Sequence, residues 1–430
     1  MINKIKAAAK NLDNKRLAKN FVSLAILKGF DYLVPLITMP YLIRTVGLEL
    51  YGLSAFALSL AIYFGAIMQF GFGVSAVREV ATHRNDIKKL SSIYSETLSV
   101  SILLTLICLA IFSCLVINID ELYKYRHLYL YSFFFISMQS LFPVWFFQGM
   151  EEMKYITYIN LLSRLFFLVS LLILITEPKD YYLVPLLNGL CMLASTCAAI
   201  WIIRNRFLVR FNLPHSSRIN RVIIDGRHAF ISQLAPTLYN NSSTFLLGIV
   251  APHNVVGVFS AATKLIDVAN SVAYLLTNTF LPYLTRNLKN FNRFSTLMII
   301  TGFLLTVFVI IFAPFLTRTL FSTSSLEVID HTRALATSIF FSFISITFGT
   351  TYLIASNSDR KLSKITALTS LFFGCCGGIA TLIFGIWGAV LTIVLCRLAL
   401  ALLFTANYLG SNPKTLPMPG KAKTGPKLDT

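Results

Sequence analysis

Two pairs of opposite charges stand inside long apolar stretches of this sequence. Lys28 and Asp31 lie three residues apart in one stretch, and Lys264 and Asp267 repeat that spacing in another. Residues three apart share a helix face, so each pair can partly neutralise itself. A charge at the centre of a membrane-spanning helix costs roughly 2.5 to 3.5 kcal/mol, which makes these residues candidates for function. Both faces are predicted to line a hydrated cavity and bind substrate. The alternative is two internal ion pairs that only ease insertion.

Two arginines, Arg164 and Arg397, stand alone in other apolar stretches. They are further candidates for substrate binding, although a long arginine side chain can also reach the membrane surface or bond a neighbouring backbone. Four intramembrane cations against two acids favour an anionic substrate such as a phosphate or pyrophosphate. The two acids are the groups that could take a coupling proton or sodium ion, and no other cofactor is expected.

Prolines and glycines are expected to shape several of the helices that position these charges. Pro35 and Pro40 follow the first charged pair, and each removes a backbone hydrogen bond and permits a kink. We therefore predict a first helix that bends and gates the cavity; kinks that merely shape the bundle are the alternative. Gly374 and Gly378 form a GxxxG pattern, which predicts close helix packing.

Composition excludes a water-soluble enzyme. Of the 430 residues, 56% are hydrophobic and only 13% are charged, whereas soluble proteins carry roughly a quarter charged residues. The sequence contains no P-loop, HExxH or GxSxG motif and no metal-spaced set of cysteines and histidines. No catalytic or metal-binding residues are therefore predicted.

The apolar stretches, with the charges and turn residues that bound them, predict an all-α polytopic membrane protein with twelve transmembrane helices. The spans lie at about residues 21–45, 48–71, 94–118, 128–148, 156–176 and 182–203, and at about 228–250, 256–283, 296–320, 333–356, 364–384 and 386–408. We expect two six-helix lobes around a central cavity, residues 1–203 and 228–410. A basic linker at 204–227 would join them, and a polar tail would follow at 411–430.

The distribution of basic residues predicts the orientation of these spans. With twelve spans, 27 Lys and Arg residues fall on one side of the membrane and six on the other. Cytoplasmic loops are enriched in Lys and Arg, so both termini are expected in the cytoplasm. The net charge of +19 is explained in the same way, and binding to nucleic acid is not expected.

Four runs of this sequence together form a recognisable pattern: Pro35 to Gly52, Phe70 to Glu79, Trp145 to Lys154 and Leu246 to Lys264. They are similar to the polysaccharide biosynthesis family of bacterial O-antigen flippases, the Wzx type. The similarity extends over about residues 20–405. This family belongs to a superfamily that also includes multidrug and toxin extruders and lipid II flippases.

The resemblance implies a function in lipopolysaccharide biosynthesis and polysaccharide transport. Such a protein moves an undecaprenyl-pyrophosphate-linked oligosaccharide repeat unit from the cytoplasmic to the periplasmic leaflet of the cell inner membrane by alternating access. It contacts membrane lipids, and it is expected to contact the O-antigen polymerase and the chain-length regulator.

Three other functions compete with this interpretation. One is a structural scaffold for the assembly complex, which would give the intramembrane charges no function. A cation-coupled drug or metabolite antiporter of the same superfamily would favour acidic rather than basic cavity residues. An O-antigen polymerase usually carries a long periplasmic loop with arginine and histidine, whereas the periplasmic connections expected here are each about a dozen residues or fewer.

Overall fold

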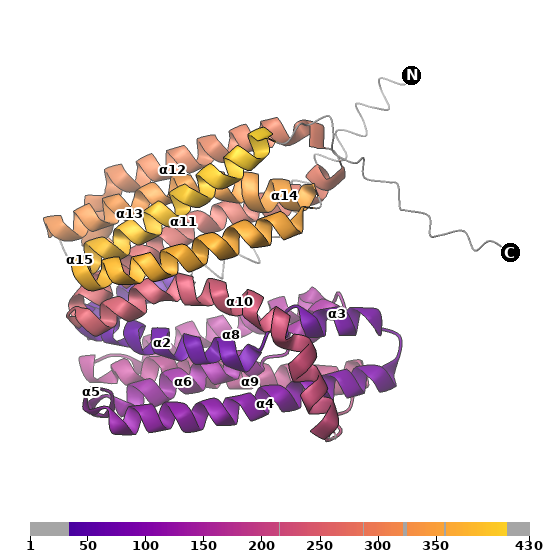
Figure 1. The fold of residues 1–430 in the computed structure, drawn as a ribbon. Coiled ribbons are helices and arrows are strands. Elements are labelled where there is room, and N and C mark those ends of the chain that lie inside the picture. Colours follow the sequence, from indigo (N-terminus) through magenta and orange to yellow (C-terminus); the bar gives the residue numbers. More distant parts are fainter. Residues whose placement is uncertain (1–33, 215, 287, 321–324, 357, 411–430) are drawn as a thin grey trace.

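A computed structural model describes residues 34–410 apart from 215, 287, 321–324 and 357 (Figure 1). Every regular element in this described part is a helix, which confirms the predicted all-α class. Lys28 and Asp31 lie outside the described residues, so their placement is not part of the structure.

The elements before the central connection begin with a helical segment at Val34–Val46. They continue with α2 (Leu48–Gln69), α3 (Ser75–Thr82), α4 (Ile87–Asn118), α5 (Asp120–Lys124), α6 (Arg126–Leu141), α7 (Val144–Gly149), α8 (Met153–Leu174), η1 (Pro178–Tyr182) and α9 (Leu183–Arg206). After the connection come α10 (Ser216–Val250), α11 (His253–Arg286), η2 (Leu288–Asn290), α12 (Phe291–Leu320), α13 (Leu326–Ser345), the π-helical turn η3 (Ile346–Thr351), α14 (Tyr352–Ala355) and α15 (Asp359–Gly410).

Nine helical stretches in the described part are long and apolar enough to cross a membrane. One of them, α15, contains a non-helical residue at Gly385 with a φ of 56° and doubles back there. The Thr392 hydroxyl consequently lies 3.5 Å from the Gly377 carbonyl, so the two halves pack antiparallel. With the shorter apolar segments Val34–Val46 and Asn241–Val250, this arrangement is consistent with the twelve predicted spans.

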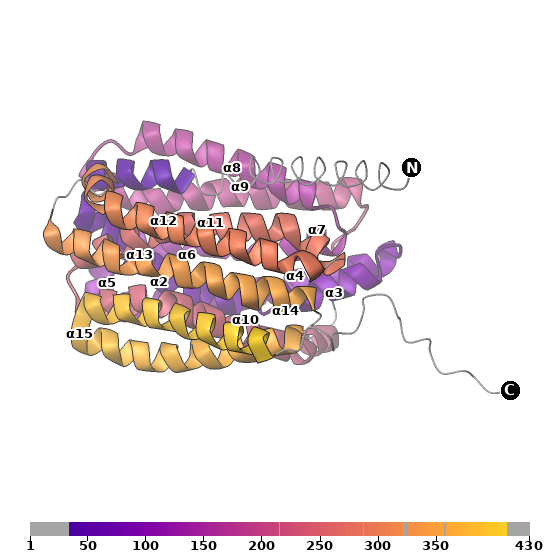
Figure 2. The same cartoon turned by 90° about the horizontal axis from the view of Figure 1, so that it is seen from above.

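The long helices form two groups whose axes run side by side (Figures 1 and 2). Helices α2 to α9 make one group, α11 to α15 make the other, and α10 lies between them and packs against both α2 and α15. The sequence places a linker at 204–227, but α9 continues to Arg206 and α10 already begins at Ser216. The connection is shorter than expected because polar residues at both ends continue the helices beyond the apolar stretches.

The start of α4 shows how a polar cap extends an apolar span. The Asp86 carboxylate accepts hydrogen bonds from the backbone amides of Lys88 and Lys89, both at 3.1 Å. These amides lack partners inside the helix, and an N-cap acceptor stabilises them. Helix α4 therefore starts at Ile87, about two turns before the apolar span predicted at 94–118.

The two groups of helices meet where α2 and α11 begin. A Cβ atom on Gly52 would overlap the His253 carbonyl oxygen and would lie 2.5 Å from the amide nitrogen of Gly257. Arg44 Nη2 also donates a 2.7 Å hydrogen bond to the carbonyl of Thr319 across the same junction. We call this junction the closed end. Figure 1 shows the groups spreading from it toward the opposite end, which carries α3 and α14.

The predicted packing of the GxxxG pattern is wrong at its first glycine. No atom lies within 4 Å of the place where a Cβ on Gly374 would stand. The close approach instead occurs at Gly377, where a Cβ would overlap the Thr392 side chain. The turn at Gly385 sets the register of the two antiparallel halves, and this register brings Gly377 rather than Gly374 to the contact.

A polar contact fastens the turn after α3 to the turn between α7 and α8. Arg84 Nε donates to the Gly149 carbonyl at 2.6 Å, and Arg84 Nη2 lies 2.7 Å from Glu151 Oε1. The hydrogen bond from Arg84 lowers the pKa of Glu151. This ion pair is therefore fully formed above the ordinary carboxyl pKa of about 4.3 and is lost as the pH falls through the lowered value.

Arg84→Ala is expected to destabilise the fold more than Glu151→Gln at pH 7. Both substitutions remove the exposed ion pair, but only Arg84→Ala also removes the hydrogen bond to Gly149, which contributes about 1 kcal/mol. Thermal unfolding of the purified variants measures the difference. Equal Tm values for the two variants would contradict a stabilising role for the Gly149 contact.

Candidate functional site

A cavity of about 1060 Å³ lies between the two groups of helices. One wall comes from Val34–Val46, α2, α6, α8 and α9, and the other comes from α10, α11, α13 and α15. The charged residues that line it, among those described, are Arg164, Lys264, Arg397 and Asp267. The structure thus brings four of the six predicted charges to one space, with three cations against one acid.

One face of α11 supplies both charged and neutral polar groups to this cavity. Lys264 and Asp267 lie on it with Ser260, Asn270 and Tyr274, at spacings that place all five along one side of a helix. Lys264 and Asp267 are exposed although they lie within a span-length helix, so the cavity must admit water. No ion pair joins these two residues in the structure, which removes the internal pair that the spacing also allowed.

Arg397 enters the cavity from the second half of α15 and is held in place by α13. Its Nη1 donates to Ser342 Oγ at 2.7 Å, and Ser342 Oγ in turn donates to the Ser338 carbonyl at 2.8 Å. Both Lys264 and Arg397 are close enough to act on the charge of Asp267. A guanidinium has five N–H donors, and the bond to Ser342 uses one of them to position Arg397. The others can bind a ligand.

The opposite wall carries Arg164 on α8, together with the side-chain amides of Gln139 on α6 and Asn188 on α9. A third amide, Asn241 on α10, donates from Nδ2 to the Ser59 carbonyl at 2.6 Å and so ties α10 to α2. Polar groups therefore face the cavity from both groups of helices.

Sequence reasoning missed these neutral groups because an amide or hydroxyl in a helix costs less than a charge and is far more common. Two of them on α11, Ser260 Oγ and Asn270 Oδ1, are buried without a hydrogen-bond partner. A buried acceptor without a partner is costly, so each is a candidate ligand contact. Their spacing of three or four residues from Lys264 and Asp267 is the signal that could have found them.

A π-helical turn also borders the cavity. Thr351 Oγ1 donates to the Ile346 carbonyl, five residues earlier, at 3.1 Å, and it also lies 3.1 Å from the Thr277 hydroxyl on α11. Single π-helical turns are frequent at functional sites. Ile346 and Thr350 from this turn line the cavity.

The two prolines predicted to gate the cavity are placed differently. Pro35 lines the cavity, whereas Pro40 does not. The chain is helical through both, from Val34 to Val46. A gating role for either proline stays a prediction, as does substrate binding by the four charged residues. No group of three His, Cys, Asp or Glu side chains that could hold a metal occurs in the described part of the chain.

Residues 17–288 match the model of a family described as polysaccharide biosynthesis protein. The chain belongs to this family. Two relatives of this chain are each named "Putative O-antigen transporter". The protein from Escherichia coli (strain K12) is 27% identical over 279 residues, which are 65% of this chain and 67% of that protein. The protein from Shigella dysenteriae is 25% identical over 398 residues, covering 90% of this chain and 98% of that protein.

Solved structures show that this family member has the fold of known membrane transporters. The lipid II flippase MurJ in an inward closed conformation matches with a TM-score of 0.70 at 14% identity, over 90% of this chain and 87% of that one. An inward-facing multidrug resistance MATE family transporter of the MOP superfamily matches with a TM-score of 0.64 at 15% identity, over 88% and 96% of the two chains. The protein is a multi-pass membrane protein, and its relatives are named transporters rather than enzymes.

Proposed function

We propose that this protein is a flippase for polysaccharide repeat units linked to undecaprenyl pyrophosphate. It would move them from the cytoplasmic to the periplasmic leaflet of the bacterial inner membrane. The observation that carries the proposal is the cationic cavity between the two groups of helices, which lies in a member of a polysaccharide biosynthesis family. The relatives named as O-antigen transporters support the same class of cargo.

The chemistry of the cavity suits the part of such a substrate that lipid excludes. A pyrophosphate with several sugars cannot enter hydrocarbon without a large desolvation penalty. Lys264 offers it a compact charge and Arg397 a bidentate donor, while amides such as Asn188 and Asn270 can bond sugar hydroxyls. The lipid tail would stay in the bilayer outside the cavity.

Transport would proceed by alternating access. The structure is closed where α2 and α11 begin, and the positive-inside rule assigns this end to the periplasm. On that assignment both termini are cytoplasmic and the cavity can load from the cytoplasmic leaflet. Parting of Gly52 from Gly257 would then release the headgroup on the other side.

Asp267 is the proposed site of ion coupling. It is the one acid among the described residues that line the cavity, and Lys264 and Arg397 act on its charge. A proton or sodium ion bound there would change the balance of charge that the substrate meets. Contact with the O-antigen polymerase and the chain-length regulator is proposed from the family alone.

The decisive experiment deletes the gene in its host and follows both the surface polysaccharide ladder and the sidedness of the lipid-linked repeat units. Repeat units trapped on the cytoplasmic face, with restoration by the intact gene, are the expected result. Unpolymerised units on the periplasmic face would instead indicate a polymerase. An unchanged ladder with normal sidedness would refute the flippase and favour the antiporter.

A further inference from the structure

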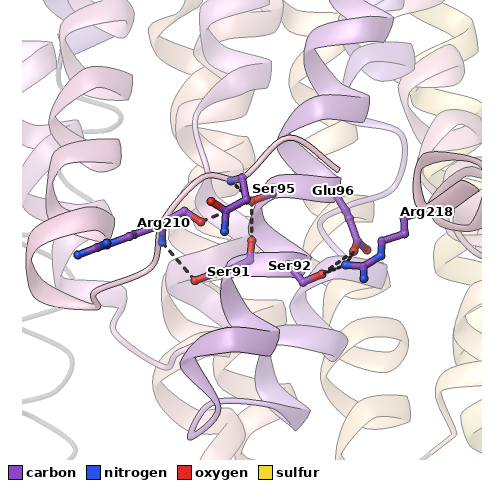
Figure 3. Close-up of polar contacts among 7 residues, drawn as sticks. Ser91, Ser92, Ser95, Glu96, Arg210 and Arg218 are labelled. Carbon is purple, nitrogen blue, oxygen red and sulfur yellow. Dashed lines mark hydrogen bonds and ion pairs between the residues drawn. The ribbon is translucent and has the colours of Figure 1, made fainter. Parts of the chain in front are cut away.

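A second hollow lies outside the central cavity, where the connection after α9 crosses the start of α4 (Figure 3). Its volume is about 640 Å³. Lys88 on α4, Arg204 on α9 and Arg210 on the connection line it, and no acidic residue does. We call it the linker pocket. Three cations from three separate segments converge there without a carboxylate between them.

The connection is fastened to α4 through its backbone, which leaves its arginine side chain free to face outward. The backbone amide of Arg210 donates to Ser91 Oγ at 3.2 Å, and that of Asn212 donates to Ser95 Oγ at 2.9 Å. Between α9 and these bonds, Val209 is fully buried while Leu208 has a φ of 57°. Figure 3 shows the side chain of Arg210 pointing away from Ser91 and Ser95.

The acids near the linker pocket are already engaged elsewhere. Asp86 caps α4 through its bonds to two backbone amides. Glu96 is only 16% exposed, accepts a 2.6 Å hydrogen bond from Ser92 and lies 3.4 Å from Arg218 (Figure 3). In the described part of the chain, Lys88, Arg204 and Arg210 form no ion pair. Their positive charge is therefore available to a ligand.

Exposed apolar side chains surround these cations. Ile87 and Leu208 line the linker pocket and are 47% and 61% exposed, and Leu213 nearby is 89% exposed. Trp201, one turn before Arg204, is also exposed, and tryptophan is enriched where a protein crosses the membrane surface. Cations beside exposed leucines at the membrane surface can bind a ligand that has an anionic head and an apolar tail.

We propose that the linker pocket binds an anionic phospholipid of the surrounding leaflet. Lys88, Arg204 and Arg210 would hold its phosphate, and Ile87, Leu208 and Leu213 would contact its acyl chains. Basic pockets beside transmembrane helices recognise lipid headgroups through such charge-assisted contacts. The site is separate from the central cavity, so this inference does not rest on the proposed function.

Native mass spectrometry of the purified full chain, titrated with phosphatidylglycerol or phosphatidylcholine, tests the proposal. Each cation is expected to strengthen binding roughly fivefold, so the triple variant K88Q/R204Q/R210Q should bind phosphatidylglycerol about a hundredfold more weakly than wild type. Binding of phosphatidylcholine should change little. An unchanged Tm without added lipid verifies that the triple variant is folded.

The variant R360Q/K361Q/K364Q is the matched control, because it removes the same charge from exposed residues at the start of α15. It should bind phosphatidylglycerol like wild type. Equal losses in both triple variants would show general charge attraction and overturn the proposal, as would unchanged binding in K88Q/R204Q/R210Q.

Two further experiments test whether the bound phosphate belongs to a lipid or is a free anion. Inorganic phosphate at millimolar concentration should not displace phosphatidylglycerol, and displacement would mean that the pocket takes a free anion instead. Leu213→Ser should weaken lipid binding a few-fold without affecting the fold, because Leu213 is almost fully exposed. If K88Q/R204Q/R210Q lost binding of the lipid-linked pyrophosphate but still bound phosphatidylglycerol like wild type, the pocket would belong to the transported substrate. That result would refute the proposal.

Discussion

Gly52→Val is expected to abolish transport by preventing the closed end from forming. The new side chain would overlap the His253 carbonyl and crowd the amide of Gly257, and backbone atoms of a helix cannot move aside as a side chain can. Overpacking of this kind costs typically 1 to 3 kcal/mol, and rigid backbone places it at the upper limit. A shift of about 3 kcal/mol lowers the population of the closed end by more than a hundredfold. The surface polysaccharide ladder of a complemented deletion strain measures the loss.

Gly374→Val is the matched control for that substitution. Both glycines lie in long apolar helices, but a Cβ on Gly374 would meet open space. The control should preserve transport, and both variants should reach the membrane in equal amounts. Normal transport by Gly52→Val would mean that the conformation seen here is not an obligatory step. Cross-linking of cysteines placed at positions 44 and 319 reports directly whether the closed end forms.

Removing two of the three cavity cations, with Lys264→Ala and Arg397→Ala together, is the other change expected to have a large effect. A hydrogen bond to a charged group contributes about 1.5 to 3 kcal/mol, so the loss of two should weaken substrate binding at least a hundredfold. Arg397→Ala alone also leaves Ser342 without its donor. Repeat units should accumulate on the cytoplasmic face although the protein is present at normal levels.

Lys361→Ala removes an exposed cation outside the cavity and should leave transport unchanged. Asp267→Asn separates coupling from binding, because it keeps the shape of the side chain but removes the group that would bind a proton or sodium ion. It should abolish the dependence of transport on an ion gradient while lipid-linked substrate still binds. Full activity of the double variant lacking Lys264 and Arg397 would refute a role for these two cations.

The sequence predicts what depends on the membrane itself. A backbone in lipid must satisfy its own hydrogen bonds, so each long apolar stretch has to be a helix. The all-α class and a number of spans consistent with twelve followed from this rule. The same membrane makes charges costly, which is why Arg164, Lys264, Asp267 and Arg397 could be selected before the structure showed them around one cavity.

Where that cost is absent, the sequence predicted less. The first turns of α10 are polar, so they resembled a linker, although they are helical and Arg218 within them donates to Ser92 and lies 3.4 Å from Glu96 on α4. Asn188 and Asn241 gave no signal, because a neutral amide is tolerated in many spans. The linker pocket could not be predicted, since its three cations are brought together from separate segments.

The sequence by itself determined the all-α membrane class of the protein and singled out the few charges that lie within the spans. Only the tertiary structure decided which of those charges share a cavity and where the two groups of helices close. The reason is physical: insertion energies depend on each span alone, whereas the contact between Gly52 and Gly257 joins residues far apart in the chain. Its geometry is set by the packing of α2 on α11, which no local pattern records.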